Sequence, residues 1–203
     1  MAYPTVDAPY GLKPVNLIGG LPFAGATRQI PIGSNYGTAI YNGDVVQLNS
    51  SGNVIITTLQ NNSSPVNGVI GVFLGCSYTN PATKQKLFSQ YYPGGVVADD
   101  IVAYVADDPN ALFKVVNVTS NVADSASGGL LPAYISRANS FGTNAELVLN
   151  TGSSVTGDSK MGVFINNVTT SLPFRVVDVV TDTANSSGNI VEFIVKFNAG
   201  YHA

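Results

Sequence analysis

The sequence predicts an all-β fold: a β-barrel or β-sandwich body of about ten short strands, preceded by an extended proline-rich arm. Two observations carry this prediction. Short runs of residues alternate between apolar and polar with the two-residue period of a pleated strand, and turns rich in Gly, Asn and Ser separate these runs at regular spacing. Strands do not alternate with long helical patterns, so we do not expect a doubly wound sheet or a (β/α) barrel.

The first part of the chain is predicted to be an N-terminal arm, residues 1–33, and the remainder a single β-barrel or β-sandwich domain, residues 34–203. The arm holds five of the eleven prolines, and proline at this spacing prevents a helix interior and disfavours central strands. It also carries more apolar residues than a solvated tail would have. We therefore expect it to dock, either along its own domain or on a neighbouring subunit. The candidate interaction residues in the arm are Tyr3, Tyr10, Leu12, Leu17 and Phe23.

The clearest element is a β-hairpin over residues 38–58, whose strands meet at a polar turn of residues 49–53. Before the hairpin's first strand, the Asn-Gly-Asp break at residues 42–44 is expected to be a bulge in which Asp44 accepts backbone amide hydrogens. On the first strand, Val46 and Leu48 are expected on one face and Gln47 on the other. On the second strand, Val54 and Ile56 are expected to share a face.

Further strands are expected along the rest of the chain, with one short helix at residues 121–127. Gly71 and Gly75 lie inside a strand and indicate bulges or close backbone approach. Asp108 and Pro109 favour a single helical turn. The further strands are predicted at residues 68–78, 85–92, 101–106, 112–119, 130–136, 145–150, 161–166, 174–181 and 189–197. In the last of these, Val191, Phe193, Val195 and Phe197 are expected on a core face, with Glu192 and Lys196 toward water.

Composition excludes several classes of protein. Charged residues make up 10% of the chain, against about 25% in ordinary soluble proteins. This is expected where other subunits cover much of the surface, and a neutral monomer is the alternative. The net charge is −3 without a cluster of Lys and Arg, so we expect no nucleic-acid partner. The longest apolar run, residues 69–76, is far shorter than the roughly 20 residues of a membrane span. The first residues lack a basic start and an apolar stretch, so we expect no signal peptide and synthesis in a cytoplasm.

Residues that carry chemistry are few. Cys76 is the only cysteine and is expected to be a small buried hydrophobe, because no cationic neighbour in sequence would activate it. His202 is the only histidine, and a position so near the end is a poor place for a rigidly held catalytic base. We expect no enzymatic activity, no metal and no cofactor.

Two acidic doublets, residues 99–100 and 107–108, could supply calcium ligands or the paired carboxylates of a glycoside hydrolase. Their neighbours favour turns in which Asp accepts backbone N–H groups. Tyr91 and Tyr92 could stack on a sugar, although adjacent tyrosines before Pro-Gly-Gly are more typical of an interface or a core anchor. Both tyrosines are therefore candidate interaction residues.

Several phrases of the sequence resemble the small structural proteins of tailed-bacteriophage heads, and most of all the capsid decoration, or cement, proteins. These phrases are YGLKP at residues 10–14, IYNGDVVQLNSSGNV at 40–54, GVIGVFLGCSY at 68–78, LFSQYYPGG at 87–95, VAYVADDPNALFKV at 102–115, RVVDVV at 175–180 and VEFIVKFN at 191–198. Major coat proteins are a weaker match, because they are longer and have a spine helix that this sequence does not predict.

The resemblance implies a β-rich body that forms a homotrimer on the exterior of the virion head, binds the major capsid protein and clamps neighbouring coat subunits without a cofactor. A tail or head–tail connector component is an alternative from the same particle. A carbohydrate-binding or glycan-degrading module is a third possibility, motivated by the adjacent tyrosines and the paired aspartates.

Overall fold

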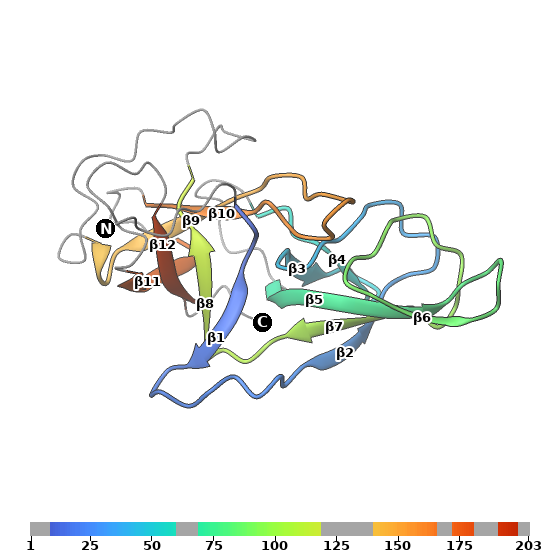
Figure 1. Cartoon of the computed structure of the whole chain (residues 1–203), viewed down its shortest axis with the longest axis horizontal. Helices are drawn as coiled ribbons and strands as arrows, with labels where there is room; N and C mark the ends of the chain where they lie inside the picture. The colour runs from blue at the N-terminus through green and yellow to red at the C-terminus, as the bar shows by residue number, and fades with distance from the viewer. Residues whose placement is uncertain (1–8, 60–68, 119–139, 166–171, 181–190, 199–203) are drawn as a thin grey trace, which may run out of the picture.

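The computed structural model describes residues 9–59, 69–118, 140–165, 172–180 and 191–198. These residues form an all-β structure of two six-stranded antiparallel sheets, as Figure 1 shows. The arrangement is sandwich-like and does not close into a barrel, so the predicted fold class is confirmed in its sandwich form. The predicted helix at residues 121–127 and the predicted strand at residues 130–136 lie outside the described residues.

The strand order fixes which segments become neighbours. The first sheet has the order β1-β8-β12-β11-β9-β10, and the second has the order β2-β7-β5-β3-β4, with β6 also paired to β5. Strands of the first sheet are β1 (Lys13–Leu17), β8 (Ala111–Val116), β9 (Asn144–Val148), β10 (Gly162–Ile165), β11 (Phe174–Val179) and β12 (Glu192–Phe197). Strands of the second sheet are β2 (Arg28–Pro31), β3 (Val45–Leu48), β4 (Val54–Ile56), β5 (Val69–Thr79), β6 (Lys86–Ser89) and β7 (Val102–Ala106).

The predicted hairpin is present as β3 and β4, with Val46 opposite Ile56 and Leu48 opposite Val54. The predicted bulges at the glycines of β5 are also present. Gly71 and Gly75 have φ angles of 146° and 154°, and the pairing register of β5 shifts beside each of them. Only glycine adopts such angles without strain, which is why these residues interrupt an otherwise apolar strand.

Two hydrophobic cores lie on opposite faces of the second sheet. The first core joins both sheets and includes Val69 and Val72 of β5 together with Phe113 of β8. The second core covers the other face and includes Ile70 and Phe73 of β5. Val69 and Val72 are three positions apart and yet share a core, because the bulge at Gly71 inserts one residue into the alternation.

The described part of the predicted arm contributes one edge strand to each sheet. β1 pairs with β8, and β2 pairs with β7. Residues 13–31 therefore run beside two strands that are themselves consecutive in the chain, β8 and β7. Pro14 and Pro31 both lie in these edge strands, where the missing N–H does not interrupt a central ladder. The described residues of this segment therefore dock along their own domain. Additional contact with another subunit stays a prediction.

Residues 107–110 form the predicted turn, in which Ala111 N donates to Asp108 O at 3.0 Å and Asn110 N donates to Asp108 Oδ1 at 2.7 Å. The chain enters β8 at Ala111, so the single helical turn expected after Asp108 does not form. A second local prediction was also wrong. Glu192, predicted to face water, has only 3% of its surface exposed, because Tyr10 and Lys114 from distant parts of the chain lie against its carboxylate.

Candidate interaction surface

The edge segment, residues 13–31, exposes a group of apolar side chains. Val15 is 39% exposed, Ile18 44% and Leu21 64%. Figure 1 shows this segment running along one side of the molecule past both sheets. Apolar side chains on an unpaired sheet edge are unusual in a monomer, because such an edge can pair with another chain.

The connection between β1 and β2 holds its apolar residues in place. Leu17 N donates to Leu21 O at 2.7 Å, and Ile18 N donates to Asn110 O at 2.8 Å in the β7–β8 turn. Gly19 and Gly20 have φ angles of 97° and 85°, which a tight reversal of the chain requires. The turn therefore presents Ile18 and Leu21 to solvent from a backbone that is anchored to the body.

Two of the predicted interaction residues are buried within the chain itself. Leu12 and Tyr92 are both 0% exposed. Leu12 packs into the first core and Tyr92 into the second, so neither side chain is available to a partner as the fold stands. Tyr92 was expected to be an interface residue or a core anchor, and in the structure it is a core anchor. Tyr3 lies outside the described residues.

The other predicted interaction residues are partly buried. Leu17 and Phe23 pack against the first core, and Tyr10 against a small third cluster. The ring of Tyr91 stacks on Tyr41, with 5.5 Å between centroids and 12° between planes. Sequence reasoning thus selected the inward-facing residues of the segment and missed the outward ones. The signal that could have found Ile18 and Leu21 is the Gly-Gly pair between them, which predicts a turn at the surface.

Tyr10 belongs to a polar cluster that covers the end of β12. Its hydroxyl donates to Glu192 Oε1, while Lys114 Nζ lies 3.1 Å from the same oxygen and 5.4 Å from the centre of the Tyr10 ring. Burial and the hydrogen bond to Glu192 raise the pKa of Tyr10 well above its ordinary value. The cluster satisfies a buried carboxylate, which makes it a structural group.

Asp100 and Asp107, one from each acidic doublet, also have structural partners. Asp100 accepts hydrogen bonds from Thr79 N at 2.9 Å and Lys86 Nζ at 2.8 Å, and the contact with Lys86 is the main cause that lowers its pKa. Asp107 lies 2.8 Å from Arg28 Nε. In the described part of the chain, no group of three His, Cys, Asp or Glu side chains could hold a metal ion.

Asp44 is the buried carboxylate of the bulge at residues 42–44. Tyr41 N donates to its Oδ2 at 2.7 Å, which confirms that Asp44 accepts a backbone amide hydrogen. Burial raises the pKa of Asp44 to about 6, although Ser159, the Tyr41 amide and Lys13 each act to lower it. The carboxylate thus holds the bulge together and titrates within a mildly acidic range.

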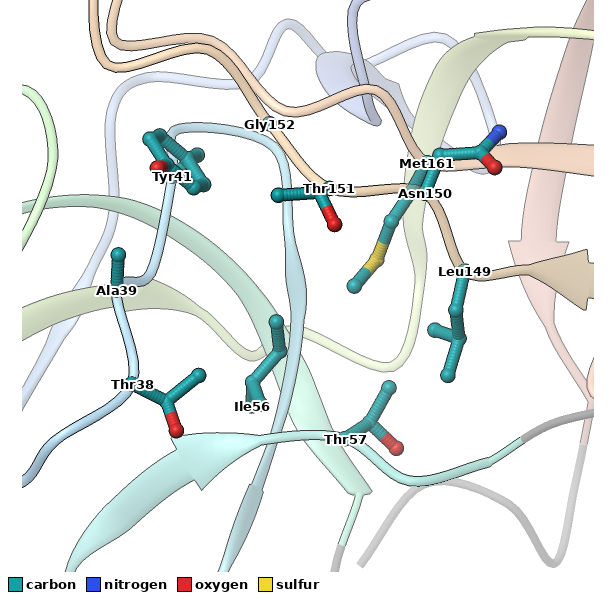
Figure 2. A pocket seen from close by; sticks show the side chains of 10 residues that line it. All are labelled: Thr38, Ala39, Tyr41, Ile56, Thr57, Leu149, Asn150, Thr151, Gly152 and Met161. Carbon is teal, nitrogen blue, oxygen red and sulfur yellow. The ribbon is translucent and has the colours of Figure 1, made fainter. Parts of the chain in front are cut away.

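A pocket of about 270 Å³ lies between the two sheets at the edge opposite β1 and β2. Figure 2 shows residues 38–41 and β4 on one side of it, and the segment that follows β9 on the other. Among the described residues that line it, the lining is mainly apolar, with Ile56, Leu149 and Met161, and holds no Asp, Glu, Lys, Arg or His. Such a pocket can accept a small apolar group.

No helix in the described residues has the length and apolarity that crossing a membrane requires. Among known proteins, no family model, no curated sequence and no solved structure matches the chain.

Proposed function

We propose that the chain is a virion structural protein: a capsid cement protein that binds the exterior of a tailed-phage head as a homotrimer and stabilises contacts between major capsid protein subunits. The observation that carries the proposal is the edge segment, which exposes Val15 on edge strand β1 and Ile18 and Leu21 in the connection between β1 and β2. The resemblance of the sequence to head decoration proteins points to the same role.

Burial of these side chains would supply the binding energy. Covering a Val, Leu or Ile side chain completely contributes about 1.5–3 kcal/mol, and part of this gain is lost to the ordering that association requires. A trimer presents the segment three times, so weak binding by each subunit adds up to tight binding of the trimer to the shell. A chain in which only 10% of the residues are charged keeps the desolvation penalty of such contacts small.

The partners of the acidic residues support a structural role over a glycan-processing one. Asp100 and Asp107 are held by Lys86 and Arg28, which leaves them committed to ion pairs at the surface. Neither lines the pocket.

Light scattering tests the trimer. We expect three times the chain mass of 21.1 kDa, and a lower mass for the double substitution of Ile18 and Leu21 by Ser. Val155→Ser is the matched control, because Val155 is 93% exposed and lies in the β9–β10 connection, outside residues 13–31. A monomeric parent protein, or a double variant with unchanged mass, would contradict the proposed interface.

Binding to heads that lack the protein tests the cement role. Cosedimentation and electron microscopy should show copies distributed over the whole shell, together with a higher temperature of head disruption. Density confined to one vertex would identify a connector component instead. Failure of the shell to bind any copies would overturn the proposal.

A further inference from the structure

Three side chains from distant parts of the sequence meet at the boundary between the two sheets. Lys13 Nζ lies 2.6 Å from Asn42 Oδ1 and 2.8 Å from Asp158 Oδ1. Lys13 belongs to β1 of the first sheet, Asn42 to the bulge before β3, and Asp158 to the β9–β10 connection. The Lys13 amine thus contacts both a carboxamide and a carboxylate, and these are the three groups that an intramolecular amide exchange requires.

The amide of Asn42 is held with its oxygen toward the amine. Asn42 Nδ2 donates to Leu74 O at 2.7 Å, so rotating the amide by half a turn would place its NH₂ against the ammonium and its oxygen against a carbonyl. The Asn42 backbone is fixed as well: its N–H donates to Gly157 O at 3.0 Å and its carbonyl accepts from Ser159 N at 2.9 Å. The carbonyl group is therefore positioned before any reaction begins.

The distance from the amine to the carbon it would attack is short. A carbonyl bond is about 1.23 Å long, so an amine 2.6 Å from Oδ1 lies within about 4 Å of Cγ. Productive near-attack arrangements have the reacting atoms about 3–3.5 Å apart. A small rotation of the lysine side chain is enough, and holding both groups in one fold replaces a bimolecular encounter.

We propose that Lys13 and Asn42 form an isopeptide bond, with Asp158 as the catalytic carboxylate. Asp158 accepts a proton from the Lys13 ammonium, and the free amine attacks Cγ of Asn42. The Nζ–Cγ bond forms, Asp158 transfers this proton to Nδ2, and the Cγ–Nδ2 bond breaks to release ammonia. Asp158 then takes the second proton from Nζ, which leaves a neutral amide, and passes it to the released ammonia, which departs as ammonium. No atom is oxidised or reduced. Gln90 Nε2 donates to Asp158 Oδ1 at 3.0 Å and keeps the carboxylate oriented toward the amine.

The bond would join the two sheets covalently. Lys13 is part of edge strand β1, whereas residues 43 and 44 exchange backbone hydrogen bonds with Phe73 of β5, at 2.8 Å each. A cross-link between them would prevent the first sheet's edge from separating from the second sheet, independently of any partner.

A competing reaction needs to be distinguished. Asn42 precedes Gly43, and attack of the Gly43 nitrogen on the Asn42 side chain would give a succinimide, which also releases ammonia. Gly43 N donates to Phe73 O at 2.8 Å, so this nitrogen is engaged in the second sheet and faces away from the reaction. The two products differ in connectivity, because only the isopeptide involves Lys13.

Mass spectrometry of the purified full chain tests the proposal. The folded protein should be lighter than its sequence by about 17 Da, the mass of ammonia. Trypsin cuts after Arg28 and Lys84 and does not cut the Lys13–Pro14 bond, so Lys13 and Asn42 fall in two peptides, residues 1–28 and 29–84. We expect these two peptides to remain joined after digestion.

Substitutions complete the test. K13R should restore the full mass and separate the two peptides, and D158N should leave most molecules unlinked while circular dichroism shows a folded chain. Lys86→Arg is the control, because Lys86 pairs with Asp100 and takes no part in the proposed bond, and this variant should stay linked. The full sequence mass after prolonged incubation at mildly alkaline pH would overturn the proposal. So would a loss of ammonia that persists in K13R, or a loss of water through a bond to Asp158.

Discussion

Gly71 and Ala106 approach each other across β5 and β7 so closely that a Cβ on Gly71 would lie 2.1 Å from the carbonyl oxygen of Ala106. The position of this Cβ is fixed by the backbone of β5, and the oxygen that it meets belongs to the backbone of β7, so neither atom can move aside without distorting the second sheet. Gly71→Ala should therefore lower the free energy of unfolding by at least about 3 kcal/mol, from strained dihedral angles and from the clash. Urea denaturation measures the change.

Gly52→Ala is the matched control for that substitution. Gly52 also has a positive φ of 76°, but a Cβ added to it would meet no atom within 4 Å. We expect it to lose only about 1–2 kcal/mol, which is the dihedral contribution alone. Equal losses at the two positions would show that the close approach to Ala106 contributes nothing.

Tyr10→Phe should destabilise the fold by removing a donor from a buried carboxylate. Glu192 is 3% exposed, and a hydrogen bond to a charged group contributes about 1.5–3 kcal/mol. Tyr104→Phe is the control, because the Tyr104 hydroxyl lies 3.1 Å from the neutral hydroxyl of Ser77, a bond that contributes about 0.5–1.5 kcal/mol. Denaturant midpoints of the two variants test the difference, and a Tyr10 variant no weaker than the Tyr104 variant would contradict it.

Sequence patterns predicted the strands well, because alternation and turn chemistry are local properties. The hairpin of β3 and β4 follows from the period of its own residues, and the bulges of β5 follow from Gly71 and Gly75. The prolines of the predicted arm correctly indicated that this segment would not form central strands. They did not reveal that the same segment would supply both sheet edges, since proline is also acceptable in an edge strand.

Pairings between distant segments could not be predicted from those patterns. Glu192 alternates with apolar residues, a pattern that indicates a solvent-facing side chain, yet residues from the other end of the chain and from β8 bury it. The cluster of Lys13, Asn42 and Asp158 joins positions up to 145 residues apart. The Asn-Gly-Asp sequence indicated a bulge, but nothing local to it indicated which side chains would meet there.

The thiol of Cys76 should be unreactive in the folded protein. Cys76 is 1% exposed and burial raises the pKa of its thiol to about 12, so both access and the thiolate fraction are small near neutral pH. Iodoacetamide at pH 8 should leave the native chain unlabelled and label it fully in concentrated urea. Rapid labelling without denaturant would show that the strand around Cys76 opens readily.

Stability should fall as the pH rises through the range in which Asp44 ionises. The folded-state pKa of Asp44, about 6, lies above the ordinary value of 3.8, so the folded chain binds this proton more tightly than the unfolded chain does. The stabilisation is fully present below about pH 4 and is lost as the pH rises through 6, a difference of about 3 kcal/mol. Burial raises the pKa of Glu146 as well, which adds a slope of the same sign.

Asp44→Asn separates the two contributions, because an amide keeps an acceptor for the Tyr41 N–H but does not titrate. Denaturation series between pH 4 and pH 6.5 should show a shallower decline for this variant than for the parent chain. Asp100 acts in the opposite direction, since its lowered pKa gives stability that is lost only on acidification below the ordinary range of an aspartate. Above pH 4 the decline therefore comes from Asp44 and Glu146, and the difference between parent and variant reports on Asp44. Identical slopes for parent and variant would show that the Asp44 carboxylate is not the group that titrates there.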